Sequence, residues 1–278
     1  MPPLPFILCA DDFGFSPGVS EGILDLASKH RLSAVSCMVT QAGFRDGASA
    51  LKSHADHLDI GIHLVLTDAR ALSPDLGQLP SMRALITKAM MGQLNGTDIK
   101  NELARQLTTF SETFGQPPDF VDSHHHVHQL PGIRDIVLEL IDEQFVSYQP
   151  YLRSCFERPA VLLGRGVAPF KAAALSVMGA ALNHRAEARK IPVIDGFSGI
   201  YDLSGKTPYG QLFDRFTNSL RPKSLIMCHP GKVDDELTAL DSLTDQREVE
   251  LAYFSSDEFR ALLSRKNLCL GRFTATPE

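Results

Sequence analysis

The segment Phe6-Ile7-Leu8-Cys9-Ala10-Asp11-Asp12-Phe13-Gly14-Phe15-Ser16-Pro17 is a short apolar run that ends in two carboxylates and a turn. Such a run, bounded by polar and turn residues, is typical of a buried strand. Ser16 can cap a following helix over about residues 17–29, and Pro17 suits the first turn of that helix. The segment therefore predicts a strand, a turn and a helix, which is the repeating unit of a parallel sheet.

The same alternation of strands and helices continues along the chain. Strands that alternate with helices imply a parallel sheet with helices outside it, so the predicted fold class is α/β. About seven strands in this length favour a closed or nearly closed (β/α) barrel, similar to a TIM barrel. The further strands are predicted over residues 34–40, 59–66, 120–124, 192–195, 225–229 and 268–273. The further helices are predicted over residues 44–53, 82–91, 97–114, 131–142, 170–189, 209–220 and 246–266.

Length and composition are those of one globular domain. The chain has 278 residues, of which 44% are hydrophobic and 22% are charged. A single (β/α)-barrel domain over residues 1–278 accounts for this composition. Residues 67–96 are rich in Pro and Gly around a short helix, and we expect them to form a lid. Residues 150–190 carry a weaker pattern and are treated as a variable segment.

Charge and cysteine usage exclude several classes of protein. The net charge of -6 comes without a basic stripe, so nucleic acid is not an expected partner. The five cysteines form no Cys-x-x-Cys pair and suggest no disulfide framework, which indicates the cytoplasm. The N-terminal apolar run is too short for a signal sequence, and residues 172–182 make about half a membrane span. We therefore expect no membrane span.

A dense histidine cluster is the strongest functional signal. The stretch Asp122-Ser123-His124-His125-His126-Val127-His128 holds four of the ten histidines. Imidazole is a common ligand of transition metals, although a polar loop without a ligand is the alternative. If the strand continued, alternation would send His124, His126 and His128 to one face and His125 to the other.

Polar residues also stand at the ends of three other predicted strands. The neighbouring carboxylates of Asp11 and Asp12 repel each other, which a cation relieves, although the pair can equally cap the next turn. His63 lies in an apolar strand, where a core histidine with a polar partner is the alternative to a ligand. His229 precedes a Pro-Gly turn, which favours exposure in a cleft and a role as general acid. Carboxyl ends of parallel strands meet at one edge, so these groups are expected in one site.

Four motifs together carry a family resemblance. In order they are Ala10-Asp11-Asp12-Phe13-Gly14, Gly61-Ile62-His63-Leu64, Asp122-Ser123-His124-His125-His126-Val127-His128 and Met227-Cys228-His229-Pro230. This set resembles the YdjC-like carbohydrate deacetylases, which include chitooligosaccharide deacetylases. The resemblance implies a distorted (β/α) barrel that uses one divalent cation to remove N-acetyl groups from amino sugars, with acetate as the other product. It also implies a possible homodimer.

The resemblance further assigns roles to residues of these motifs. It implies that Asp12, His63 and His124 bind the metal, that Asp11 is the general base and that His229 is the general acid. The residues that it implies for substrate binding are Phe13, His126, His128, Arg153 and Pro230.

The metal and the reaction each leave alternatives. The resemblance suggests Mg²⁺, whereas two imidazoles and one carboxylate favour Zn²⁺ or another first-row transition ion. The same ligands could polarise a phosphoryl oxygen, so a phosphoesterase is an alternative to the deacetylase. A sugar-binding module without turnover is the third hypothesis, but it gives the paired carboxylates no chemical task.

Overall fold

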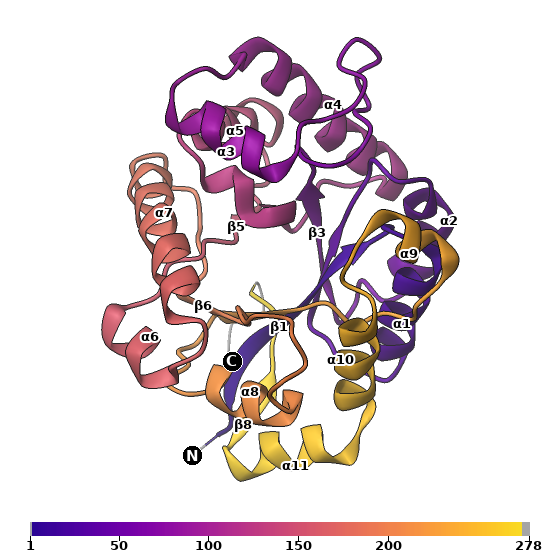
Figure 1. Cartoon of the computed structure of the whole chain (residues 1–278), viewed down its shortest axis with the longest axis vertical. Coiled ribbons are helices and arrows are strands. Elements are labelled where there is room, and N and C mark those ends of the chain that lie inside the picture. The colour runs from indigo at the N-terminus through magenta and orange to yellow at the C-terminus, as the bar shows by residue number, and fades with distance from the viewer. Residues whose placement is uncertain (1, 274–278) are drawn as a thin grey trace.

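The computed structural model describes residues 2–273 and has an α/β architecture in which parallel strands are surrounded by helices (Figure 1). The strands are β1 (Leu4–Phe13), β2 (Ala34–Cys37), β3 (Asp59–Leu64), β4 (Phe120–Ser123), β5 (Tyr151–Leu152), β6 (Gly196–Ser198), β7 (Ser224–Cys228) and β8 (Leu268–Leu270). The helices are α1 (Pro17–Ser28), α2 (Ala42–Lys52), α3 (Met82–Met90), α4 (Gly96–Phe114), α5 (Ile133–Gln144), α6 (Pro159–Arg165), α7 (Pro169–Ala188), α8 (Tyr209–Phe216), α9 (Asp235–Leu240), α10 (Asp245–Ser255) and α11 (Asp257–Arg265), with a 3-10 helix η1 (His124–Gln129).

The sheet is curled and runs in the order β5-β4-β3-β2-β1-β7-β6, with β8 paired to β1. Every pairing between these strands is parallel. The two ends of this order approach each other where Leu152 of β5 forms a parallel bridge with Val193, three residues before β6. The prediction of an α/β fold with a distorted barrel of parallel strands is therefore confirmed.

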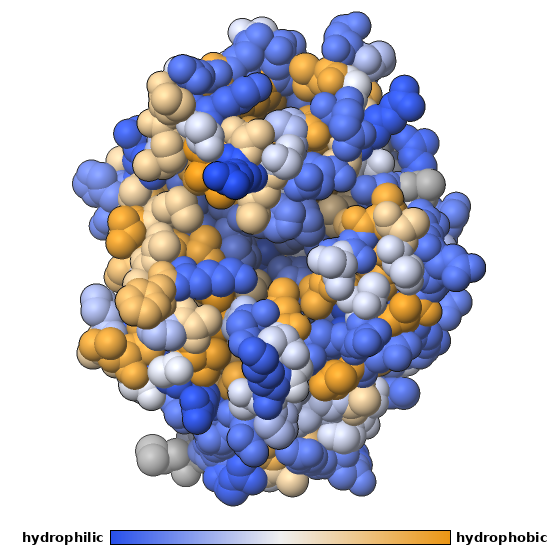
Figure 2. All heavy atoms as spheres, in the orientation of Figure 1, coloured by the Kyte–Doolittle hydropathy of each residue, from blue (hydrophilic) through white to orange (hydrophobic). Residues whose placement is uncertain are grey.

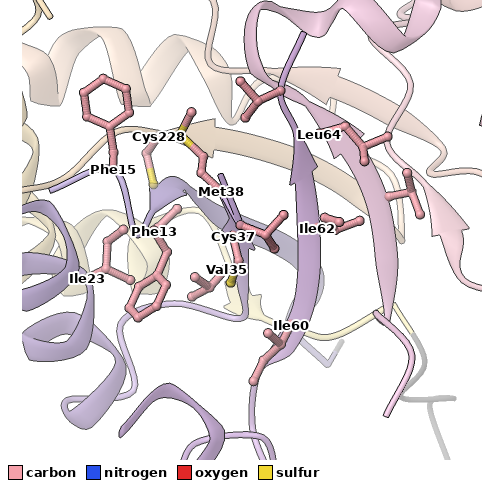
Figure 3. Packing of buried hydrophobic residues seen from close by; sticks show 14 of the residues in the cluster. Phe13, Phe15, Ile23, Val35, Cys37, Met38, Ile60, Ile62, Leu64 and Cys228 are labelled. Carbon is pink, nitrogen blue, oxygen red and sulfur yellow. The ribbon is translucent and has the colours of Figure 1, made fainter. Parts of the chain in front are cut away.

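Alternate residues of β1 face two different cores, as strand geometry requires. Phe6 and Leu8 belong to the larger core between the sheet and the outer helices, part of which is drawn in Figure 3. Ile7 and Cys9 belong to a smaller core inside the curl, together with Phe120 of β4. Because both faces of the central strand are covered, its sequence is an almost unbroken apolar run.

Three sequence predictions of elements are corrected by the structure. Residues 192–195 precede the strand, because β6 begins at Gly196 and only the bridge to Leu152 involves this stretch. The predicted helix over residues 246–266 is two helices, because Ser256 has extended backbone and caps α11 through Phe259 N. The strand β4 ends at Ser123, so the histidine cluster is not a strand continuation.

Residues 67–96 and 150–190, the two segments set apart in the sequence, both contribute side chains to one cavity. Residues 67–96 contain α3 and an antiparallel bridge between Arg70 and Gln78, and residues 150–190 contain β5, α6 and α7. Within residues 2–273, none of the helices combines the length and apolar character that crossing a bilayer requires.

Candidate metal centre and active site

A bulge at the end of β1 brings two adjacent carboxylates into one cavity. Regular alternation would send Asp11 and Asp12 to opposite faces of the sheet. However, the register of β1 against β2 shifts between Ala10 and Phe13, and Asp12 has a left-handed φ of 67°. Asp tolerates this conformation better than most residues, and the extra residue of a bulge re-aims a side chain. Both carboxylates consequently line the cavity.

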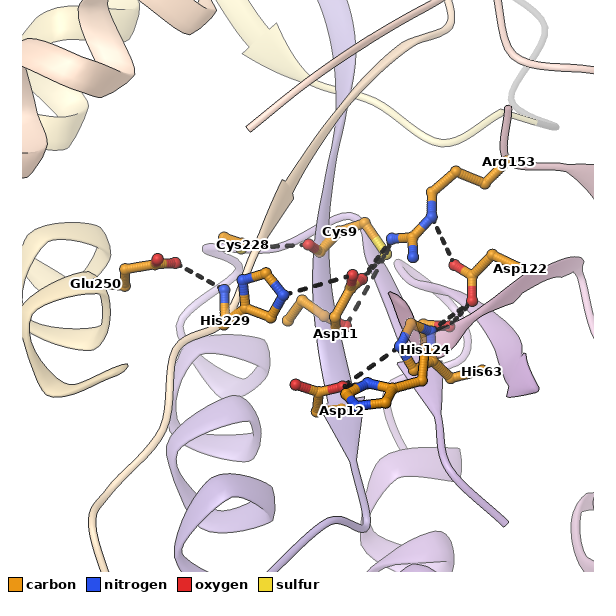
Figure 4. Close-up of polar contacts among 12 residues, drawn as sticks. Cys9, Asp11, Asp12, His63, Asp122, His124, Arg153, Cys228, His229 and Glu250 are labelled. Carbon is orange, nitrogen blue, oxygen red and sulfur yellow. Dashed lines mark hydrogen bonds and ion pairs between the residues drawn. The ribbon is translucent and has the colours of Figure 1, made fainter. Parts of the chain in front are cut away.

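The three residues predicted to bind metal lie together at the carboxyl ends of three strands (Figure 4). Asp12 Oδ1 lies 3.3 Å from His63 Nε2 and 3.2 Å from His124 Nδ1. Their candidate ligand atoms all lie within 4.8 Å of one another. One carboxylate and two imidazoles form a donor set that suits a divalent first-row transition ion, so these residues fit the implied metal.

Asp122 holds Nδ1 of His63, the ring nitrogen that faces away from Asp12. Asp122 belongs to the histidine-rich motif, but the sequence assigned it no role. His63 Nδ1 donates to Asp122 Oδ1 at 2.6 Å, and Ser36 Oγ donates to the same oxygen at 2.6 Å. This contact fixes the ring and directs Nε2 toward Asp12. Burial lowers the pKa of His63, but the charge of Asp122 and hydrogen bonds with Asp12 and Asp122 raise it to about 10. A proton and a metal ion therefore compete for Nε2.

Arg247 of α10 neutralises the other side of Asp12. Its Nη2 lies 2.8 Å from Asp12 Oδ2 and 3.0 Å from Asp241 Oδ2, and Arg247 is almost fully buried. Burial raises the pKa of Asp12, but the charge of Arg247 and hydrogen bonds from His124 and His63 hold that pKa well below its usual range. Asp12 is therefore ionised, with Oδ1 facing the two imidazoles.

Arg153 is buried behind the other carboxylate of the pair. Its guanidinium lies 2.5 Å from Asp11 Oδ1 and 2.9 Å from Asp122 Oδ2, and its side chain has no exposed area. Cys9, Asp11 and Asp122 also place candidate ligand atoms within 4.8 Å of one another. The guanidinium already contacts both of these carboxylates. It therefore supplies the positive charge that a metal ion would otherwise bring to this second group.

His229 faces the free oxygen of Asp11. The distance from His229 Nε2 to Asp11 Oδ2 is 3.9 Å, and the imidazole is partly exposed to the cavity. The backbone N–H of His229 donates to Glu250 Oε2 at 2.6 Å, and the hydroxyl of Tyr201 donates to the other oxygen of Glu250. Burial raises the pKa of Glu250, despite the opposing effect of His229 and the Tyr201 hydrogen bond. The end of β7 is thus anchored to α10.

The histidine cluster does not alternate as a strand would. His125 and His126 have left-handed φ values of 56° and 57°, inside η1, and His124, His125 and His126 all line the cavity. His128 is buried instead, with Nε2 donating to the carbonyl oxygen of Arg153 at 2.7 Å. Successive left-handed residues turn the chain sharply, and strained backbone of this kind clusters at functional sites.

Burial keeps three of these imidazoles neutral. Desolvation, and then the charge of His124, lower the pKa of His125 to about 3. Desolvation lowers the pKa of His128 to about 4, although Asp122 opposes this change, and it lowers the pKa of His126 well below its usual range together with Arg153. Neutral imidazoles can accept as well as donate hydrogen bonds.

The structure places the five residues predicted to bind substrate in different surroundings. Of the five, only His126 lines the cavity, which has a volume of about 480 Å³. Phe13 is fully buried in the larger core, and its ring packs against the backbone of Gly47 in α2. Pro230 and Arg153 are buried as well, and both ring nitrogens of His128 have protein partners. These four residues therefore do not line the cavity in this structure, and their role in substrate binding stays a prediction.

Several residues of the site carried no signal in the sequence. Arg247 and Glu250 lie three positions apart on a helix far from every motif, and Tyr201 lies in an irregular segment. Only Asp122 and Ser36 could have been found, because each is a polar residue in a short buried strand.

The chain is similar in sequence to proteins that are named as carbohydrate deacetylases. The chain is 28% identical over 272 residues to a carbohydrate deacetylase of Geobacillus stearothermophilus. This match covers 95% of this chain and 94% of that protein. It is 37% identical over 139 residues to a chitooligosaccharide deacetylase of Serratia marcescens, covering 47% of this chain and 53% of that protein.

A crystal structure from Enterococcus faecalis V583, of a protein named for cellobiose-phosphate cleavage, has the same fold. It superposes with a TM-score of 0.72 at 22% identity and covers 97% of both chains. The model of the YdjC-like protein family matches residues 5–265, which is most of the chain. This protein therefore belongs to the YdjC-like family, as its four motifs predicted.

Proposed function

We propose that this protein is a metal-dependent N-deacetylase of acetylated amino sugars. The observation that carries the proposal is a carboxylate and an imidazole, Asp11 and His229, that face each other beside the donor set of Asp12, His63 and His124. Amide hydrolysis needs a base for the attacking water and an acid for the leaving amine, and this cavity offers both. The relatives named as carbohydrate deacetylases support the same reaction.

Each residue has a distinct task in the proposed mechanism. A divalent cation on Asp12, His63 and His124 would lower the pKa of a water molecule and polarise the acetamide carbonyl. Asp11 accepts the proton of the attacking water at Oδ2, while the ion pair with Arg153 holds Oδ1 in place. His229, in its protonated form, donates a proton to the departing amine, so that acetate and a free amino sugar result.

Finer features of the function belong to the same proposal. The two-imidazole, one-carboxylate donor set favours Zn²⁺ or another first-row transition ion over Mg²⁺. We also propose a cytoplasmic, single-domain protein that forms a homodimer, with residues 67–96 acting as a lid. Met82 and Ile86 of this segment line the cavity, which supports the proposed lid.

Acetate release from diacetylchitobiose by the metal-loaded protein tests the proposal. We expect Asp11→Asn and His124→Ala to lose at least about 10²-fold in kcat/KM, since they remove the base and a ligand. His184→Ala changes an exposed histidine of α7 outside the cavity and serves as the matched control. Full activity of Asp11→Asn would refute its role as base. Release of phosphate from phosphate esters, with no acetate from acetylated sugars, would favour the phosphoesterase instead.

A further inference from the structure

One wall of the active-site cavity is aliphatic. The floor carries the carboxylates and histidines described above, and Lys171 of α7 also lines the cavity. The side formed by α3, η1 and α7 otherwise presents mainly apolar side chains: Met82, Ile86, Val127, Leu130, Leu175 and Met178. Sugar hydroxyls that leave water need hydrogen-bond partners, and these side chains provide none. Apart from the histidines, Tyr201 is the one aromatic lining residue among the described residues, so this wall is not a stacking platform for sugar rings.

The apolar wall continues onto the outer surface. Met82, Ile86 and Met90 recur every four residues along α3, and Met90 is 68% exposed. Figure 2 shows hydrophobic residues gathered over α6 and α7 beside the central hollow. On α7, Phe170 is 90% exposed and Val177 is 73% exposed.

Ala174 connects the two parts of this surface. It lies between Phe170 and Val177 on the same exposed stripe of α7, and it also lines the cavity. Contiguous exposed apolar surface marks a binding site on a soluble protein. Pairing of two copies of the chain would cover only the outer part of this apolar surface. An elongated apolar ligand whose polar end lies on the catalytic floor would contact both the cavity wall and the outer part.

We propose that the substrate is an acetylated amino sugar joined to a long aliphatic aglycone, whose chain lies along the wall formed by α3 and α7. This inference rests on the proposed function, because the acetamido group must occupy the polar floor. The apolar chain then leaves the cavity over Ala174 toward Phe170 and Val177. The structure thereby distinguishes a glycolipid-type substrate from a free, wholly polar oligosaccharide.

A series of methyl, butyl and octyl glycosides of N-acetylglucosamine tests the assignment. The glycosides are used below their micelle-forming concentrations, with metal-loaded protein, and acetate release gives kcat/KM. A fully buried methylene contributes about fourfold. Because the chain is only partly covered, we expect kcat/KM for the octyl glycoside to exceed that for the methyl glycoside by about tenfold or more.

Variants of wall residues test whether the dependence of kcat/KM on chain length arises at the apolar wall. We expect Ile86→Ser and Ala174→Asp each to reduce the octyl-to-methyl ratio of kcat/KM by at least about fivefold, since they make the path of the chain polar. Val146→Ser is the matched control, because Val146 is 86% exposed but does not line the cavity. An unchanged ratio in both wall variants would overturn the assignment.

Calorimetric binding of the same glycosides separates this inference from the proposed function. Acetate release without dependence on chain length refutes the aliphatic aglycone and leaves the deacetylase intact. Binding that strengthens with chain length, without acetate from any glycoside, supports the apolar subsite and refutes the deacetylase. A dimer that Val177→Asp dissociates, together with no chain-length effect, would assign the face to a second copy and overturn the inference.

Discussion

At the scale of single residues, the site depends on carboxylates whose two oxygens have different partners. Asp12 gives one oxygen to the imidazoles and the other to Arg247, and Asp122 gives one to His63 and the other to Arg153. Two buried guanidinium groups thus compensate the negative charge around the candidate metal site. Their removal should affect stability as well as activity.

Arg247→Met should strongly destabilise the fold. It leaves Asp12 buried without its counter-charge, and breaking a buried pair in this way typically costs about 3–5 kcal/mol. Denaturant unfolding of the metal-free protein measures the free energy of unfolding. Arg260→Met, which removes an exposed ion pair with Asp257, is the control and should give no measurable change. Equal stability of the two variants would contradict this account of the Asp12 contact.

Asp122→Asn should weaken metal binding by about 10- to 100-fold, because loss of the carboxylate partner of a ligating histidine lowers its basicity and frees its ring. Titration calorimetry with Zn²⁺ measures the dissociation constant. Asp135→Asn, in an exposed pair with Arg185, is the control for removing one negative charge. Unaltered affinity in Asp122→Asn would show that His63 needs no such partner.

At the scale of elements, the sequence predicted what depends on regular patterns. The apolar run of β1 and the amphipathic pattern of α4 both lie where periodicity placed them. Two features without a regular pattern were not predicted. The two-residue strand β5 is too short to show alternation, and Ser256 interrupts a helical pattern without Gly or Pro.

The residues of the candidate site likewise fall into those that the sequence predicted and those that it did not. The strand-end motifs identified Asp11, Asp12, His63, His124 and His229, which the fold gathers in one cavity. The orientation of the histidine cluster could not be predicted, because the left-handed backbone at His125 and His126 depends on tertiary packing. Arg247 and Glu250 could not be predicted either, because nothing local distinguishes them from the solvent-exposed charges of an ordinary helix.

Gly199→Ala should show how closely β6 and β7 approach at the cavity. Gly199 has a φ of 105°, and an added Cβ would lie 2.3 Å from the carbonyl oxygen of Met227. Together, strain and overlap should lower the free energy of unfolding by about 2 kcal/mol or more. Gly164→Ala in α6 meets nothing within 4 Å and should stabilise the fold by up to about 1 kcal/mol. Denaturant unfolding of both variants checks the contrast, and equal effects would contradict it.

At the scale of the whole molecule, metal binding should be visible as thermal stabilisation. A ligand present at a hundred times its dissociation constant adds about 2.7 kcal/mol to the folded state. We expect Zn²⁺ to raise Tm by several degrees, more than Mg²⁺ at the same concentration, and a chelator to reverse the change. His124→Ala should remove the response, and His184→Ala should retain it. An undiminished Zn²⁺ response in His124→Ala would place the metal elsewhere.

The contact between Asp12 and Arg247 joins residues that are 235 positions apart. Asp12, His63 and His124 all belong to the first half of the chain, on strands β1 and β3 and at the end of β4. During synthesis, the three candidate ligands are therefore present long before α10 emerges with its guanidinium. Contacts this distant in sequence form slowly because their loop-closure entropy must be overcome first. The candidate metal ligands are therefore synthesised first, and the guanidinium that balances the charge of Asp12 is synthesised last.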